Sequence, residues 1–517
     1  MKTVKNLSMA ALVLMGTVIT SCNKIEQNSE PVPAAEDNVV VCSTTVSLGT
    51  DGTKALTSTG VKTFAAGEQM AIIYKNSSNQ TVKAVSEPLP AGDYGASATF
   101  TFTLTAPSRT ENVTYIYPAT MAASTVATDA AVDAEANVNY AALATQDGTL
   151  ATLSSSLDYC TKSGAWNGWN LPTLTLENQL AILAITLKNN AATPADITST
   201  ITGMTLSDGT NSYAVTREAA AGPIYVAIRP TASASIDITA TDGTKNYTKT
   251  LSGKTYAAGN GYPVSWRMLP AGALAGKFTI NPSNNKVYFS KGNLKYNGSA
   301  WSFFDNQYDY LGTYSSTNWG LFGWSTSKTT YGKSTSKSNS DYSGDFKDWG
   351  NLAITNGGNA ANSGWRTLTS AEWTYLFNTR ESGSTVFGTS NARYAHATIN
   401  TDGTGVNGMI LFPDGVTIAT TEVSTAGTVN GTSAWGTKCT SAQWTALESK
   451  GCVFLPAAGG RDGSSVYSAG SYGLYWSGTA NGTVSAYRVL FHSGSLTPAD
   501  SNYRSGGFSV RLVRPAE

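Results

Sequence analysis

The feature that most limits the fold of this chain is a strict two-residue alternation between Ala98 and Ala106. Phe100, Phe102 and Leu104 alternate with threonines, so one face of the segment is apolar and the other is polar. Successive side chains of a strand point to opposite faces, so this pattern predicts a strand buried on one side only. Such strands are typical of antiparallel sheets with one wet face.

Strand signals of this kind divide the first half of the chain into two β units, residues 39–170 and residues 171–270. In the second unit, Leu180–Leu187 is apolar on both faces, which predicts a central strand that is covered on both sides. Asp242-Gly243 lies between two strand-like runs and predicts a hairpin turn. The Ala-rich stretch 119–150 has no clean period and is expected to be a long loop or a loose helix.

Residues 271–276 are small and are expected to form a flexible linker, after which a third unit follows at residues 277–517. This unit holds nine of the twelve tryptophans of the chain. It also contains two nearly identical octapeptides, Thr369–Leu376 and Thr440–Leu447. Each begins with Thr-x-x-Glu or Thr-x-x-Gln, the capping box of a helix start. The third unit is therefore predicted to be α+β, with two short helices against a sheet.

The first 22 residues carry export signals. A positively charged head precedes an apolar run from Leu7 to Ile19, and the sequence Ile19-Thr20-Ser21-Cys22 follows. This predicts a signal peptide at residues 1–22 that is too short to span a membrane. Its end matches the lipobox of bacterial lipoproteins, and this resemblance implies lipidation of Cys22 and, because no Asp follows, an outer-membrane location. The polar, Pro-bearing residues 23–38 are expected to form a tether.

Low charge argues against several classes of function. Charged residues make up 13% of the chain and the formal net charge is zero, so no basic stripe for nucleic acid is visible. The sequence has no phosphate-binding glycine loop, no nucleophile elbow and no local carboxylate pair. Its two histidines, His396 and His492, lack metal-ligand spacing and are expected to have structural or surface roles. We therefore predict no catalytic residue, no metal and no cofactor, and we do not expect an enzyme.

Four of the five cysteines remain once Cys22 is assigned to lipid. Cys439 and Cys452 flank the second predicted helix, which would hold them roughly 15–18 Å apart at 1.5 Å per residue. A disulfide needs Cα atoms within about 7 Å, so no bridge is expected there. A bridge between Cys42 and Cys160 stays open, because export permits disulfides.

Three segments in the first half occur in a recognisable order: Phe64–Ile72, Tyr117-Pro118 and Tyr256–Tyr262. With the lipobox before them, they make residues 40–268 resemble fimbrillins, the pilus subunits of anaerobic gut and oral bacteria. The resemblance implies two transthyretin-like β-sandwich domains and export as a lipoprotein. It also implies assembly in which a protease removes the first strand and the C-terminal strand of the next subunit fills the groove.

The third unit carries a second ordered series of motifs: Gly364–Arg366, Val406–Gly415, Phe454–Gly463, Tyr475–Ser477 and Gly507–Arg514. The series is similar to the Fibrobacter-type major paralogous domain, a relative of C-type-lectin-like folds, over residues 277–515. Formylglycine-generating enzymes share the general fold but need a cysteine pair that this sequence does not show. Likeness of fold alone is a weak ground for sugar binding.

Two departures from pilus shaft subunits affect the expected role. A whole domain follows the second unit, so the last strand of that unit is not expected to be donated, although the chain can still accept a strand; this favours a tip position. Shaft subunits that resemble this chain are cleaved after an Arg, and no Arg occurs between Cys22 and Arg109. Cleavage, and with it polymerisation, therefore stays open.

Candidate ligand-binding residues come from two places in the third unit. The long loop predicted over residues 312–350 is rich in aromatic side chains, which offer flat apolar area with a polar edge, and a Gly-rich turn adds two charged residues. The candidates are Trp319, Trp324, Tyr331, Trp349, Arg461 and Asp462. The alternatives are that the aromatic rings fill a core under the loop and that Arg461 and Asp462 form a local ion pair that stiffens the turn.

The sequence thus predicts a mainly β protein with two β-sandwich domains and a C-terminal α+β, C-type-lectin-like domain. The expected function is a surface adhesin, a pilus-tip or pilus-associated subunit. Its expected partners are other pilus subunits, a host or bacterial surface glycan or protein, and the outer membrane through the lipid. The alternative is a permanently anchored glycan- or protein-binding lipoprotein that does not polymerise; a third hypothesis is an enzyme with an unrecognised site.

Overall fold

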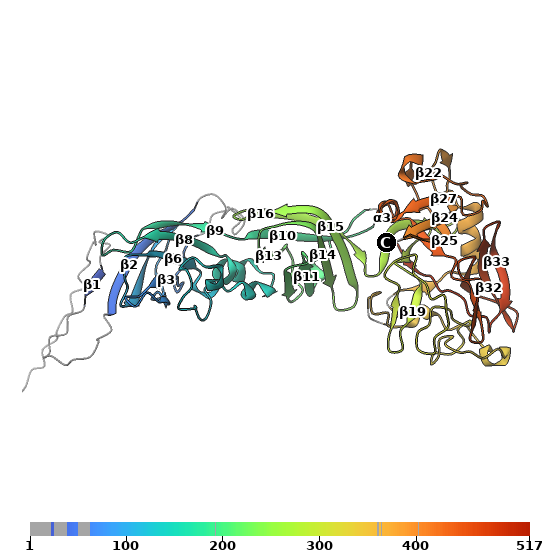
Figure 1. Ribbon diagram of the computed structural model, residues 1–517, viewed down its shortest axis with the longest axis horizontal. Coiled ribbons are helices and arrows are strands. Elements are labelled where there is room, and N and C mark those ends of the chain that lie inside the picture. The colour runs from blue at the N-terminus through green and yellow to red at the C-terminus, as the bar shows by residue number, and fades with distance from the viewer. Residues whose placement is uncertain are drawn as a thin grey trace, which may run out of the picture. The chain divides into compact units, whose positions relative to one another are not determined.

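The computed structural model confirms the mainly β fold with few short helices (Figure 1). Most of the predicted signal peptide and tether lies outside the described residues, as does the side chain of Cys22. The structure describes residues 22–24, 39–49, 63–191, 193–358, 361–362, 364–401 and 403–516.

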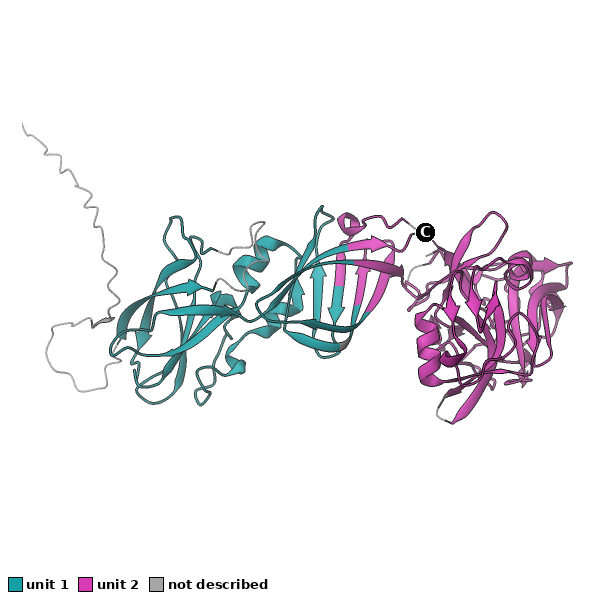
Figure 2. Ribbon diagram, turned by 90° about the horizontal axis from the view of Figure 1, so that it is seen from above, with its two compact units in different colours: residues 1–186, 205–237, 251–265 teal, residues 187–204, 238–250, 266–517 magenta. Residues whose placement is uncertain are grey.

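The chain packs into two compact units (Figure 2). The first contains residues 1–186, 205–237 and 251–265, and the second contains residues 187–204, 238–250 and 266–517. The boundary runs through strands of the second predicted β unit, so most of that sheet belongs to the first compact unit.

The first β unit forms one eight-stranded sheet, in the order β1-β2-β9-β8-β6-β3-β4, with β5 on the other side of β2. As the alternation predicts, β5 buries Phe100, Phe102 and Leu104 and exposes or half-exposes the threonines between them. The strands are β1 (Cys22–Lys24), β2 (Val39–Leu48), β3 (Ala71–Lys75), β4 (Thr81–Val85), β5 (Ser97–Thr105), β6 (Asn112–Tyr117), β8 (Cys160–Ala165) and β9 (Leu174–Asn178).

Strand β2 has neighbours on both sides. It pairs with β5 in antiparallel register from Val39 opposite Thr105 to Ser47 opposite Ser97, and its far end pairs in parallel with β9. Strand β1, which spans the predicted lipidation residue Cys22 and the first two residues of the predicted tether, lies antiparallel to β2 with Cys22 opposite Cys42. Cys160 is buried and is not disulfide-bonded, so the Cys42–Cys160 disulfide that the sequence left open does not form.

The second β unit also forms an eight-stranded sheet, in the order β13-β10-β16-β15-β14-β11-β12-β7. Strand β10, the predicted central strand, lies between β13 and β16, and Gly243 turns the chain between β14 and β15 with a φ of 86°. The strands are β7 (Thr145–Gln146), β10 (Ala181–Asn189), β11 (Gly203–Ser207), β12 (Ser212–Thr216), β13 (Ile224–Ile228), β14 (Thr231–Thr241), β15 (Asn246–Tyr256) and β16 (Gly261–Pro270).

The side chain of Gln146 helps to join the two ends of this sheet. Gln146 pairs with β12 through its backbone, while its side-chain amide donates to the carbonyl of Ala227 at 2.8 Å and accepts from the Ala227 N–H at 2.9 Å. Next to it, the N–H of Tyr225 donates to the carbonyl of Gly148 at 2.9 Å. The amide of Gln146 thus supplies the pairing that a further strand would give to β13.

We expect Gln146→Leu to lower the free energy of unfolding by about 1–3 kcal/mol, because the buried N–H and C=O of Ala227 lose their partners. Urea unfolding measures the change, and hydrogen exchange at the Ala227 amide locates it. Gln179→Leu is the matched control, since the side chain of Gln179 makes only one exposed hydrogen bond. Equal effects of the two substitutions would contradict the closing role of Gln146.

The C-terminal region begins without the six-residue linker that the sequence predicted. Only Ala271 and Gly272 turn between β16 and the next strand, because Ala273–Thr279 pairs with Lys286–Ser290. Three main sheets follow. The first contains β17 (Ala273–Thr279), β18 (Lys286–Ser290), β34 (Leu512–Pro515) and β21 (Arg366–Thr367). The second contains β27 (Thr437–Thr440), β24 (Tyr394–Thr401), β25 (Thr404–Leu411) and β28 (Val453–Pro456), and the third contains β31 (Tyr472–Asn481), β32 (Ser485–His492) and β33 (Ser495–Tyr503).

Both predicted helices form, and both capping boxes are present. Helix α2 (Ser370–Thr374), extended by one wider turn to Thr379, starts at Thr369, whose side chain accepts from the Glu372 N–H. Helix α3 (Ser441–Ser449) starts in the same way at Thr440, with Gln443 in the position of Glu372. Each helix buries a tryptophan and a leucine three residues apart, as the repeated octapeptides predict.

Candidate functional site

The four aromatic candidates belong to one core of the C-terminal region. Trp324 and Trp349 are 1% and 0% exposed, and each indole N–H donates to a backbone carbonyl at 2.9 Å, of Ser477 and Tyr331 respectively. Trp319 and Tyr331 are each 8% exposed. The structure therefore brings the four rings together, but as a packed interior in which each of the three indole N–H groups already donates to a backbone carbonyl.

Arg461 and Asp462 are adjacent in sequence but lie in different surroundings. The guanidinium of Arg461 is buried, donates to the carbonyls of Leu321, Ser334 and Gly463, and stacks 5.0 Å from the centre of the Trp319 ring. Burial lowers the pKa of Arg461, with small opposing effects from nearby Tyr and Asp side chains. Asp462 is exposed and pairs instead with Lys337 at 2.7 Å.

A hollow beside these candidates is small. It lies against Trp319 and Arg461 and has a volume of about 10 Å³, enough for about one water molecule. The carbonyl contacts of Arg461 bind the turn to the loop at Leu321 and Ser334. This placement favours a structural role for Arg461 and leaves Asp462 and its partner Lys337 at the surface.

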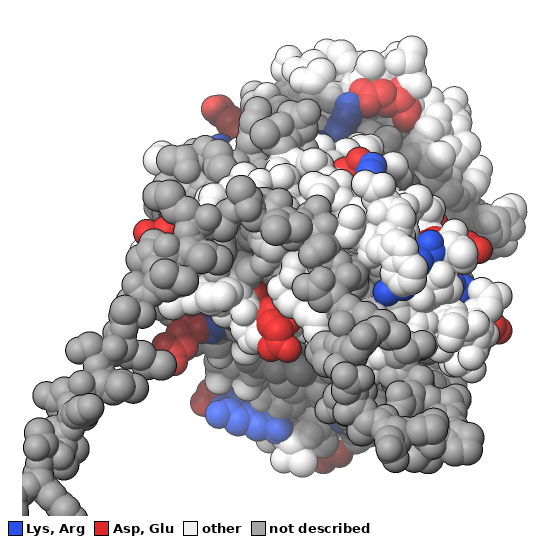
Figure 3. Space-filling view, turned by 90° about the vertical axis from the view of Figure 1, so that its left-hand side faces the viewer, with Lys and Arg blue, Asp and Glu red and all other residues white. Residues whose placement is uncertain are grey.

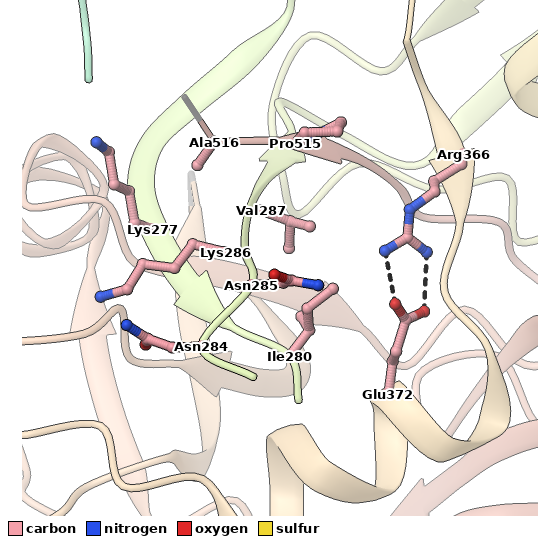
Figure 4. Close-up of a pocket in the computed structure, with 10 residues that line it drawn as sticks. All are labelled: Lys277, Ile280, Asn284, Asn285, Lys286, Val287, Arg366, Glu372, Pro515 and Ala516. Atoms are coloured by element: carbon pink, nitrogen blue, oxygen red, sulfur yellow. Dashed lines mark hydrogen bonds and ion pairs between the residues drawn. The ribbon is translucent and has the colours of Figure 1, made fainter. Parts of the chain in front are cut away.

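A much larger pocket lies elsewhere in the same compact unit, with a volume of about 550 Å³ (Figure 4). Strands β17 and β18 and the turn between them form one side, the C-terminal end of β34 forms another, and the start of α2 closes the third. The lining residues are Lys277, Ile280, Asn284, Asn285, Lys286, Val287, Arg366, Glu372, Pro515 and Ala516.

Two ion pairs shape this pocket. Arg366 and Glu372 form a bidentate pair with N···O distances of 2.8 and 2.6 Å, drawn as dashed lines in Figure 4. On the other side Lys286 lies 3.2 Å from Asp414, a carboxylate that is also bound by the buried Arg380 at 2.9 Å. Because Asp414 serves two cations at once, it neutralises only part of the positive charge around it.

Lys277 adds a third cation to the lining. Its ammonium donates to the carbonyl of Asn190 and lies 5.7 Å from the centre of the Tyr288 ring. Its pKa is lowered, first by burial and then by the positive charges of Lys286 and Arg267. Burial is the larger cause, and the two nearby cations add to it.

The residue at the third position of the helix start distinguishes the two helices. Glu372 in α2 completes the capping box and also binds Arg366, and its pKa is lowered because the hydrogen bonds from Arg366 and Thr369 outweigh its burial. In α3 Gln443 completes the same box with no charge, and it accepts from the Ser424 hydroxyl. The cap therefore does not require a carboxylate, and the charge of Glu372 serves its pairing with Arg366.

Sequence reasoning missed this pocket because its residues come from three distant segments. The Gly364–Arg366 motif and the first capping box were both visible, but their convergence with residues 277–287 and the C-terminal end needs the pairing of β18 with β34. The difference between Glu372 and Gln443 in otherwise matched octapeptides was the one signal that could have pointed to Arg366.

Other site chemistry is sparse. Among the described residues, no three His, Cys, Asp or Glu side chains are grouped as a metal site would require. No helix within the described ranges is both long and apolar enough to span a membrane. On the face drawn in Figure 3, acidic and basic side chains of the described residues are scattered among uncharged surface.

No family model matches the chain, and no curated protein matches it in sequence. Among solved structures, it is similar to a fimbrial assembly protein from Parabacteroides distasonis, with 12% identity over 48% of this chain and 95% of that chain and a TM-score of 0.25. It is also similar to a fimbrial protein from Bacteroides ovatus, with 11% identity over 91% of this chain and 98% of that chain and a TM-score of 0.22.

Proposed function

We propose that the chain is a non-catalytic cell-surface adhesin, a fimbrial subunit at the pilus tip or associated with the pilus, that presents its C-terminal, lectin-like region for binding. The order of a lipobox, a fimbrillin-like pair of β units and a third, different unit in the sequence supports this role. The structural observation that carries the proposal is the position of β16, the last strand of the second sheet.

Strand β16 is committed to its own chain. It lies between β10 and β15, and its end pairs with β15 through Leu269 opposite Thr248 and Pro270 opposite Tyr247. The chain then enters β17 after two residues. Donating β16 to a neighbour would break strand pairing on both sides, so the chain is unsuited to donate its last strand.

Strand β2, by contrast, is suited to replacement. Its residues alternate between buried and half-buried positions, and its apolar side chains face Phe100, Phe102 and Leu104 across the pairing with β5. Loss of β2 would leave an apolar groove with free backbone groups, which a strand of the same alternation from another subunit can fill. A subunit that accepts a strand and donates none belongs at a filament end.

The alternative is a lipoprotein that stays anchored through Cys22 in the outer membrane and captures a glycan or protein without polymerising. The lack of an Arg between Cys22 and Arg109 favours this alternative, since shaft-type cleavage follows Arg. In that case β2 stays in place and the sandwich keeps its own first strand.

The N-terminus of the protein in filaments separates the two functions. We expect mass spectrometry of sheared surface filaments to find this chain without its lipid and without Val39–Leu48, because β2 must leave before another strand can enter. The outer-membrane fraction serves as the control and is expected to retain the unprocessed form. Recovery only as an intact lipidated form in the membrane would contradict the tip proposal and support the anchored alternative.

A further inference from the structure

We propose that the pocket between β17, β18 and the start of α2 binds an anionic sugar, a monosaccharide unit that carries a carboxylate or a sulfate. This inference rests on the proposed adhesin function and gives it a ligand class. Three observations carry it: the charge of the lining, the pairing that holds one of its cations, and the mixed polarity of its walls.

The lining has an excess of positive charge in a chain that has none overall. Lys277, Lys286 and Arg366 line the pocket with one carboxylate, Glu372, whereas the whole chain balances 34 basic and 34 acidic residues. Asp414 lies outside the lining and is shared between Lys286 and the buried Arg380, so three carboxylate-paired cations and Lys277 face two carboxylates. The pKa of Lys277 is lowered first by burial and then by the positive charges of Lys286, which lines the pocket, and of Arg267, which does not. An anion seated between the cations would relieve that repulsion.

Arg366 is paired with Glu372, and the helix cap that Glu372 completes does not require a charged residue. The guanidinium of Arg366 donates two hydrogen bonds to the carboxylate of Glu372. In α3 the uncharged amide of Gln443 completes the same capping box. Arg and carboxylate form the strongest planar pair available to proteins, so a carboxylate or sulfate ligand competes with Glu372 for the same guanidinium. Glu372 therefore limits the affinity of the pocket for anions.

The remaining walls suit a sugar better than a bare ion. Figure 4 places Ile280, Asn285 and Val287 between the two lysines on one side and the Arg366–Glu372 pair on the other. Asn284 and Asn285 add amides that can both donate and accept, which matches sugar hydroxyls. Ile280, Val287 and Pro515 add apolar surface for the C–H faces of a ring. A volume of about 550 Å³ lies within the range of small-molecule sites.

Calorimetric titration of the full chain tests the proposal. The probes are N-acetylneuraminic acid, glucuronic acid and galactose 6-sulfate, with galactose and glucose as neutral controls. We expect at least one acidic sugar to bind and the neutral sugars not to bind, with affinity that falls as salt rises. The carboxylated and sulfated probes distinguish the two sources of the anion.

Substitutions locate the binding. Lys286→Gln is expected to weaken the acidic sugar about fivefold or more, the effect of one charge-assisted contact. Lys291→Gln is the matched control, because Lys291 pairs with Asp305 and does not line the pocket. Lys286→Arg keeps the charge and is expected to bind within about twofold of the parent chain.

Glu372→Gln is expected to strengthen binding of the acidic sugar, whereas Lys286→Gln weakens it. The substitution of Glu372 removes the competing carboxylate while keeping the capping box, so we expect affinity for the acidic sugar to rise about threefold to tenfold. Gln443→Glu adds a carboxylate at the equivalent position of α3, away from the pocket lining, and is expected to leave binding unchanged. Circular dichroism and melting confirm that each variant is folded. If Lys286→Gln does not fold, Glu372→Gln decides the outcome, and if Glu372→Gln does not fold, Lys286→Gln decides it.

The inference is overturned if no acidic sugar binds, if neutral sugars bind equally well, or if folded Lys286→Gln and Glu372→Gln both bind like the parent chain. Binding of a Glu-rich peptide in place of every sugar, with the same dependence on Lys286, would also overturn it, in favour of a protein ligand. Filament incorporation without acidic-sugar binding removes the pocket inference alone. Sugar binding by a chain that never enters filaments removes the pilus role alone.

Discussion

Trp349→Ala is expected to lower the free energy of unfolding of the C-terminal region by about 3–5 kcal/mol, the cost of removing a fully buried tryptophan. The ring has no exposed surface, packs 5.4 Å from the centre of the Phe346 ring, and donates its N–H to Tyr331. The substitution leaves a cavity and an unpaired buried carbonyl. Urea unfolding followed by tryptophan fluorescence measures the loss.

The matched control is Trp169→Ala, because the side chain of Trp169 is 69% exposed and lies outside every buried core. Its expected effect on the free energy of unfolding is within about 0.5 kcal/mol. A Trp349→Ala protein of undiminished stability that had lost ligand binding would show that the ring serves a ligand and not the core. This pair of variants therefore tests the aromatic candidates more directly than a binding assay alone.

Acidification is expected to destabilise the same region through His396. The imidazole is fully buried, lies 5.4 Å from the Trp435 ring centre and 6.2 Å from that of Phe491, and neither nitrogen has a hydrogen-bond partner of good geometry among the described residues. Burial, and then the nearby His492, lowers the pKa of His396 from 6.5 to about 4, and the backbone of Ser433 opposes the shift.

The lowered pKa of His396 determines how stability changes with pH. Below pH 6.5 the unfolded chain binds a proton at this position while the folded chain does not, so stability falls as the pH falls towards 4, by up to about 3 kcal/mol. Unfolding free energies of the parent chain and of His396→Leu, measured between pH 7 and pH 4, isolate the effect, since other groups contribute to both. Parallel pH profiles for the two proteins would mean that His396 is not the buried neutral group.

Local patterns in the sequence predicted local structure well. The threonine alternation identified β5, the doubly apolar run identified β10, and the two capping boxes placed the starts of α2 and α3. Each of these signals is complete within about ten residues, because the period of a strand and the cap of a helix depend on near neighbours.

Features that depend on distant segments could not be predicted in this way. Residues 271–276 have the composition of a linker, but pairing of β17 with β18 draws them into a sheet. The aromatic loop has the composition of a binding surface, but it packs into a core with residues more than 100 positions away, such as Ser477, whose carbonyl accepts from Trp324, and Phe508. The closing role of Gln146 depends on Ala227, 81 residues later, and nothing near Gln146 in the sequence signals it.

The placement of β16 between two neighbours has a consequence for the population of filaments as well as for one molecule. Under the proposed function, other subunits can attach to this subunit at just one of its ends, so each filament contains one copy of it. The number of copies on a cell then equals the number of filaments, and the ratio of shaft subunits to this chain sets the mean filament length. Raising expression of this chain alone would give more filaments, each of them shorter.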